Sequence, residues 1–201
     1  MSTIFGDIKD ASQTEDLVLD CLNDWLPVYL REFELQRAIA ADSFPHPKSF
    51  LRVNELDKFP EDQLPVILTI SPGLADEPVQ EGDGGRLIMP WDISVAVEIM
   101  ARERMETGRF CRQYTAVIMA ILMQQSGHYC GAVDLIDVRF DDLPVEDERT
   151  IGVGVVQITA WVEDSLMRWA GPSPPPDPDT QPGSQWPGVA TTVVDVEPKQ
   201  D

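Results

Sequence analysis

One stretch of the chain, residues 87–100, restricts the fold more than any other, because apolar side chains there occupy every second position. The alternating apolar residues are Trp91, Ile93, Val95, Val97 and Ile99. Successive side chains of a strand point to opposite faces, so this pattern predicts a long strand with one buried face. The fold must therefore contain a sheet that is covered on one side. Pro90, near the start of this strand, indicates a sheet edge or a bulge.

Two other stretches have the spacing of amphipathic helices. The first begins near Ser12 and Glu15, which have the spacing of a capping box, and extends to about residue 41. Pro27 lies inside it, and a proline removes one helical hydrogen bond, which predicts a kink or a break into two helices. The second helix is predicted over about residues 105–125. Its apolar stripe consists of Phe110, Tyr114, Val117, Ile118 and Ile121.

The remaining patterns predict further strands: a short one at 50–53, a buried one at 66–70, and two more at 133–140 and 151–163. The last two are joined by a polar turn at 141–149, and Val156, Ile158, Ala160 and Val162 alternate along the second of them, which predicts one shared face. The predicted order, in which only one helix intervenes between strands, favours an α+β fold. We expect a mainly antiparallel sheet with both helices packed on it.

The composition changes abruptly at Gly171. Eight of the 17 prolines lie in the last 31 residues, and Leu, Ile, Phe and Met are absent from them. Such a segment has too little apolar surface to form a core, and its prolines favour an extended conformation. We therefore expect a globular domain over 1–170 and an extended arm over 171–201.

Within the arm, residues 191–196 form a short patch of high strand propensity. This patch is predicted to add as a strand to the sheet edge of another subunit. The predicted interface residues are Thr191, Thr192, Val193 and Val194. The alternative is an arm that contacts nothing.

The charge excludes several classes of function. The chain has 35 acidic and 15 basic residues and a formal charge of −20, so it is poorly suited to coat nucleic acid, which is bound through Lys and Arg. The alternative interpretation is that the acidity only keeps the protein soluble. No apolar run approaches the roughly 20 residues that cross a bilayer. The N-terminus has no pattern of a secretory signal, and three cysteines without a pattern predict free thiols.

No catalytic constellation is present in the sequence. The glycine-rich stretch at 82–85 lacks the pattern of a phosphate-binding loop and is expected to be a hairpin turn. His128, Cys130 and Cys111 lack the spacing of a zinc site. We expect no enzyme activity, no cofactor and no metal. The alternative is a metal-dependent hydrolase that uses the acidic cluster Asp141, Asp142, Glu146, Asp147 and Glu148.

Basic residues gather at the start of the second predicted helix. They are Arg102, Arg104, Arg109 and Arg112. In so acidic a chain, the group is predicted to bind carboxylates of a neighbouring subunit. The alternative for each arginine is a weak pair within the chain, with Glu103 or Glu106.

Four segments resemble tail terminator proteins of long-tailed bacteriophages, especially those that infect actinobacteria. They are LPVYLREFE (26–34), KFPEDQLPVILTISPG (58–73), YTAVIMAIL (114–122) and FDDLPVEDERTIGVGVVQITAWVE (140–163). The resemblance covers about residues 15–165 and leaves the arm out. It implies a small α+β fold and a structural role in the virion without a reaction.

The resemblance further implies a homo-oligomer, a hexameric ring that assembles in the host cytoplasm. Such a ring caps the tail tube protein, stops its polymerisation and binds the head-side connector or stopper protein, while DNA passes through the lumen. A ring of this kind needs a head-to-tail interface. Its expected parts are the exposed side of the strand at 87–100, an edge at Pro90 and the arginine group.

Other functions remain open at the level of the sequence. The chain could be another neck component such as a head–tail stopper, although those resemble small β-barrels with fewer helices than predicted here. It could also be the hydrolase considered above, or a peptide-binding adaptor that the arm inhibits.

Overall fold

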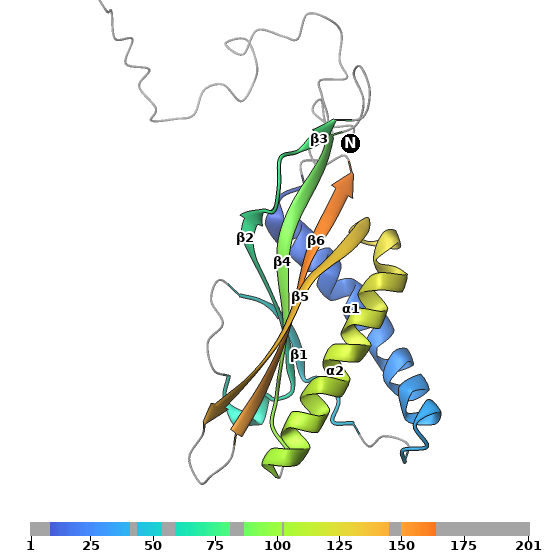
Figure 1. Ribbon diagram of the computed structural model, residues 1–201, viewed down its shortest axis with the longest axis vertical. Helices are drawn as coiled ribbons and strands as arrows, with labels where there is room; N and C mark the ends of the chain where they lie inside the picture. Colours follow the sequence, from blue (N-terminus) through green and yellow to red (C-terminus); the bar gives the residue numbers. More distant parts are fainter. Residues whose placement is uncertain are drawn as a thin grey trace, which may run out of the picture.

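The computed structural model describes residues 9–40, 44–53, 59–80, 87–101, 103–144 and 150–163. Two long helices, α1 (Ala11–Gln36) and α2 (Arg104–Gln125), pack on one face of a twisted sheet (Figure 1). The strands are β1 (Ser49–Arg52), β2 (Val66–Leu74), β3 (Val79–Gln80), β4 (Leu87–Ile99), β5 (Ala132–Pro144) and β6 (Thr150–Glu163). Short 3-10 turns lie at η1 (Glu61–Gln63) and η2 (Ser126–His128). The expected α+β class is confirmed.

The strand order is β1-β2-β4-β6-β5, and β3 pairs with β4 beside the end of β2. All pairs are antiparallel except β1 with β2. The expected edge at Pro90 is wrong, because β4 lies inside the sheet between β2 and β6. Pro90 is tolerated there because it lies opposite the interruption between β2 and β3, where its carbonyl accepts a bond from the Ala75 amide.

Helix α1 differs from the prediction at both ends and in its middle. Its N-cap is Asp10, whose Oδ1 accepts the Gln13 amide at 2.9 Å, so the expected capping box at Ser12 is wrong. The helix runs through Pro27 as one element, so of the kink or break predicted there, the break into two helices is wrong. Pro27 and Asn23, whose carbonyl loses its usual partner, are both exposed, and water can satisfy that carbonyl.

The C-terminus of α1 lies five residues earlier than expected, at Gln36. The Ile39 amide bonds to the Glu34 carbonyl and the Ala38 amide to the Leu35 carbonyl, which is the pattern of a Schellman cap. Ala38 takes a positive φ of 51° there. This cap turns the chain away from the helix and toward Phe44, which enters the core.

The main core lies between the helices and the sheet. The alternating residues of β4 and β6 face it as predicted, with Ile93, Val95, Val97, Val156 and Ile158 each at most 1 % exposed. The apolar stripe of α2 is buried against them. Gly154 of β6 allows the close approach of α2, because a Cβ built there would lie 2.2 Å from Thr115 Oγ1.

A second, smaller core lies on the other face of the sheet. It contains Leu64, Val66, Leu68, Ala96, Ile151 and Val153, and Phe59 packs against it. Glu98 of β4 is only 1 % exposed and accepts the Phe59 amide at 3.3 Å. The polar alternate positions of β4 are therefore partly buried as well, which the alternation alone did not predict.

Several sequence predictions fall outside the described residues. They are the arm at 171–201 with Thr191, Thr192, Val193 and Val194, the glycine-rich stretch at 82–85, Arg102, and the acids Glu146, Asp147 and Glu148. Asp141 and Asp142 are described, but they lie on β5 and not in the turn expected for them.

Candidate functional site

The arginine group of α2 divides into paired and unpaired side chains. Arg104 reaches Asp142 of β5, with 3.3 Å between Nη2 and Oδ2, and Arg109 reaches Glu106 at 3.4 Å. Both pairs are exposed, so each adds little stability. The pair of Arg109 with Glu106 agrees with the intrachain alternative, whereas the partner of Arg104 was not foreseen. Arg112 is exposed and makes no ion pair with any described residue.

A hollow of about 940 Å³ lies between α1 and α2, on the side of the helices away from the sheet. Its lining includes Val28 and Leu35, which are 55 % and 69 % exposed, and the small residues Ala116 and Ala120. We call this hollow the helix groove. Tyr29 and Phe33 supply aromatic walls, so the floor of the groove is apolar.

Arginines surround the helix groove. Arg31 lines it directly, and Arg37 and Arg112 line the adjoining hollow together with Phe33 and Ala116. The Arg37 guanidinium lies 5.5 Å from the centre of the Phe33 ring, a cation–π contact that holds it beside the groove. Of the described residues that line the two hollows, Glu32 is the one with a carboxylate. In a chain with an excess of acids, this surface is locally basic.

A second surface with exposed apolar side chains lies along the outer side of β5, and we call it the β5 edge. Strand β5 pairs with β6 along one side and with no described strand along the other. Leu135, Ile136 and Phe140 are 42 %, 56 % and 46 % exposed on it. A register shift between Leu135 and Asp137 makes Ile136 the residue of a bulge. A long strand with an unpaired side and exposed apolar residues is a template for contact with another chain.

The β5 edge is also acidic. It carries Asp134, Asp137, Asp141 and Asp142 against a single base, Arg139. Arg139 binds Asp137, with 2.6 Å between Nε and Oδ2, and this contact lowers the pKa of the Asp137 carboxyl. Asp134 accepts the Trp161 indole N–H at 2.7 Å. Charge and apolar surface are thus combined along one strand.

The predicted acidic cluster does not assemble into a metal site in the described part of the chain. Asp141 pairs with Val153 and Asp142 with Gly152, and consecutive residues of a strand point to opposite faces. The two carboxylates therefore cannot hold one ion together. Among all described residues, no three His, Cys, Asp or Glu side chains are close enough to hold a metal.

The cysteines are buried free thiols in the structure, as expected. Burial raises the pKa of Cys21 and Cys111 to about 11 and that of Cys130 to about 12. A reactive cysteine needs a lowered pKa and an accessible sulfur, so these three have the properties of structural residues.

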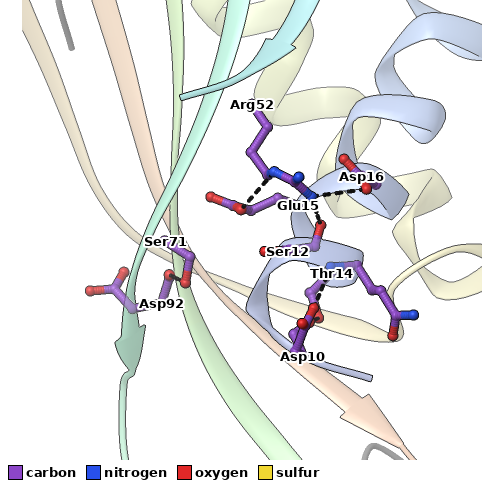
Figure 2. A network of polar contacts seen from close by, with 9 residues as sticks. Asp10, Ser12, Thr14, Glu15, Asp16, Arg52, Ser71 and Asp92 are labelled. Atoms are coloured by element: carbon purple, nitrogen blue, oxygen red, sulfur yellow. Dashed lines mark hydrogen bonds and ion pairs between the residues drawn. The ribbon is translucent and has the colours of Figure 1, made fainter. Parts of the chain in front are cut away.

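A polar network fastens the start of α1 to the opposite edge of the sheet (Figure 2). Arg52 of β1 donates from Nη1 to Asp16 Oδ2 and to the Ser12 carbonyl, both at 3.1 Å, and its Nε lies 3.9 Å from Glu15 Oε2. Glu15 is buried and also accepts the Ser71 amide. Burial raises the pKa of Glu15 more than these two partners lower it.

This network has the geometry of an anchor and not of a reactive centre. Its charged groups are bonded to neighbours within the chain: Arg52 to Asp16, and Gln157 of β6 to the Asp92 carboxylate at 3.2 Å. Ser71 Oγ donates to the Asp92 carbonyl at 2.7 Å. A nucleophile paired with a base is absent from it. The helix groove and the β5 edge differ from this network because they expose large apolar side chains in the described part of the chain.

Comparison with known proteins adds no family assignment: neither a protein-family model nor a curated protein sequence matches this chain. Neither helix of the described part combines the length and the apolar character that crossing a bilayer requires.

Both surfaces have signals in the sequence. Helical spacing from Leu22 and Trp25 predicts Val28 on the buried side of the first helix, and this is wrong, because Val28 is exposed. Leu35 lies seven residues after Val28, on the same side of the helix, and is exposed as well. Leu135 and Ile136 are adjacent apolar residues in an otherwise alternating strand, and that irregularity is typical of a bulge.

Proposed function

We propose that this chain is a structural virion protein, the tail terminator of a long-tailed bacteriophage. In this proposal its copies form a ring, most simply a hexamer, that caps the tail tube and joins it to the head-side connector. The identity of the assembly comes from the resemblance of residues 15–165. The structural observation that carries the proposal is the pair of prepared contact surfaces, the β5 edge and the helix groove, on a fold with the expected α+β architecture.

The proposed function depends on the shape of the binding faces of the ring and involves no chemical reaction. A terminating ring must reproduce the face by which one tube ring binds the next, and it must omit the face that would accept a further ring. Once it is bound, the tube cannot grow. The described residues contain a satisfied polar network and buried inert thiols, and these are compatible with such a scaffold.

The charge is also compatible with a lumen that DNA crosses. Six copies at −20 each carry −120 formal charges. Tight binding of DNA depends on cationic groups that displace its counterions. A ring with this excess of carboxylates lets the polyanion slide past without being retained.

The proposal is tested by removing the gene from the phage genome that encodes the chain. Electron microscopy of infected cells should then show overlong tails without heads, because nothing stops the tube or joins it to the connector. Complementation with the full chain should restore tails of normal length. Tails of normal length that still carry heads after deletion would contradict the proposal.

A further inference from the structure

The helix groove and the β5 edge match each other in chemistry. The groove has an apolar floor with Val28, Leu35 and Ala116, and the edge presents Leu135 and Ile136. Desolvation of both apolar surfaces would be favourable, and neither is covered by another described part of the same chain. Each is therefore able to bury the other if they belong to different copies.

Their charges are of opposite sign. Three arginines and one glutamate line the groove and the hollow beside it: Arg31, Arg37, Arg112 and Glu32. The β5 edge has four aspartates and one arginine. Opposite potentials steer two surfaces together and fix their register, whereas groove on groove or edge on edge would place like charges opposite each other.

The two surfaces lie on different sides of the molecule. The groove lies between the two helices, on the side away from the sheet. Both helices lie on one side of the sheet (Figure 1), and β5 is its border strand. A contact between unlike surfaces leaves a free groove and a free edge on every pair of copies. Such a head-to-tail contact adds further copies and forms a ring where the rotation between copies closes, whereas a contact between identical surfaces stops at a dimer.

From these observations we infer that the partner of the helix groove is the β5 edge of a second copy of this chain. The arginines of α1 and α2 then meet the aspartates of β5, and Ile136 at the bulge enters the apolar floor. This inference rests on the proposed ring and names its subunit contact. It also gives the predicted interface role of Arg112 a definite partner, and it leaves Arg104 in its pair with Asp142.

Cysteine cross-linking of the full chain tests the contact. One chain carries both Ala116→Cys in the groove and Ile136→Cys on the edge, and two control chains carry one substitution each. The native cysteines are buried and do not interfere. Mild oxidation is applied to the concentrated protein and to particles assembled with tail tubes, and products are separated on a denaturing gel.

The double variant should give a ladder of covalent multimers, and the single variants should stay monomeric. A dimer from Ile136→Cys alone would show edge-to-edge pairing, and a dimer from Ala116→Cys alone would show groove-to-groove pairing; either result overturns the inference. Absence of multimers in both preparations also overturns it. A cross-link of Ala116→Cys to a third variant, Val194→Cys, would place the chain's own arm in the groove with the same consequence.

Charge reversal provides an independent readout. Arg37→Glu with Arg112→Glu should abolish the ladder, Asp137→Arg with Asp141→Arg should abolish it as well, and the combined fourfold variant should regain it. Asp76→Arg with Glu77→Arg, two exposed residues outside both surfaces, is the matched control and should cross-link like the parent. Circular dichroism confirms that each variant is folded. A ladder unaffected by the reversals contradicts the charge match.

The outcomes also separate this contact from the proposed function. A six-fold ring on tail tubes whose cross-links avoid the groove and β5 would leave the function standing and refute the contact. A ladder in the purified protein, with no ring on any tail tube, would support the contact and refute the proposed function.

Discussion

The two edges of the sheet are built in opposite ways. The β1 edge is four residues long, pairs in parallel with β2, and is fastened to α1 through Arg52 (Figure 2). The β5 edge is thirteen residues long, presents three exposed large apolar residues and has no described strand on the side away from β6. Short or covered edges protect a protein from unwanted pairing. The β1 edge is therefore fastened within the chain, while the β5 edge stays open in the described part of it.

The two edges also differ in how their charged residues are paired. Arg52 of β1 contacts two carboxylates and a carbonyl of the same chain, so its charge is paired within the molecule. At β5, the aspartates outnumber the single arginine of the strand. An excess of one sign on an exposed apolar strand is unfavourable for the isolated molecule and becomes favourable next to a basic surface. The local excess of arginine around the helix groove supplies such a surface.

The largest expected effect concerns the side of the sheet that supports β5. Gly154→Val places a side chain where even a Cβ would meet Thr115 Oγ1 at 2.2 Å and Cys111 Sγ at 3.1 Å. We expect the free energy of unfolding to fall by roughly 3 kcal/mol, because α2 must move away from β6. Urea denaturation followed by circular dichroism measures the change.

Gly127→Ala is the control for this prediction, since a Cβ at Gly127 has no neighbour within 4 Å. Its stability should change by less than about 0.5 kcal/mol. Equal losses for the two variants would show that close packing of α2 against β6 does not hold this side together.

A smaller effect separates the two edges directly. Arg52→Ala removes the bonds from β1 to Asp16 and to the Ser12 carbonyl and leaves the buried Glu15 without its nearby cation. We expect a loss of about 1 kcal/mol, moderated by the partial exposure of Arg52. Amide exchange of Ser49–Arg52 should accelerate while that of β5 remains as in the parent, as mass spectrometry would show.

Arg139→Ala is the matched change at the other edge. The Arg139–Asp137 pair is short but exposed on both sides, so its loss should cost less than about 0.5 kcal/mol. If Arg139→Ala costs as much as Arg52→Ala, the distinction between a fastened and an open edge fails.

A gain in stability that depends on pH is expected at Glu98, which lies beside the second core that β1 borders. Burial raises the pKa of Glu98 more than its bond from the Phe59 amide lowers it. The folded state then binds a proton more readily than the unfolded state. Stability contributed by this group is therefore lost as the pH rises from its ordinary pKa of 4.5 through the raised pKa, and it stays lost above that range.

Glu98→Gln keeps an acceptor for Phe59 and removes the buried charge. At pH 7 it should raise the free energy of unfolding by up to about 1 kcal/mol, and the gain should vanish below pH 4.5, where the native carboxyl is neutral. Denaturation curves at several pH values measure it, with the exposed Glu77→Gln as a control that changes nothing. A gain that is independent of pH would argue against a charge at Glu98 as its cause.

Local patterns predicted most of the fold because those patterns report burial. The alternation in β4 and β6 and the stripe of α2 placed these elements with their correct faces, since burial of apolar side chains dominates their packing. The edge at Pro90 and the break at Pro27 were wrong for a common reason. A proline has no backbone N–H and therefore cannot donate a hydrogen bond. The tertiary structure decides whether a hydrogen bond from that position is needed.

The candidate surfaces were only partly predictable. The arginine group was visible as a cluster of rare residues. Its division into Arg104, which is paired across to β5, and Arg112, which has no ion pair with a described residue, depends on the distance between α2 and β5. Arg31 lines the helix groove and Arg112 lines the hollow beside it, although the two residues are 81 positions apart in the sequence. The spacing of residues within either helix could not predict that these two arginines lie on neighbouring hollows.

Electron microscopy of the full chain mixed with tail tubes tests the central claim most directly, because it shows whether the molecule assembles into a closed collar. We predict a six-fold ring bound at one end of each tube, and tubes that no longer elongate when more tube protein is added. Tubes that keep growing, with no ring at either end, would contradict it.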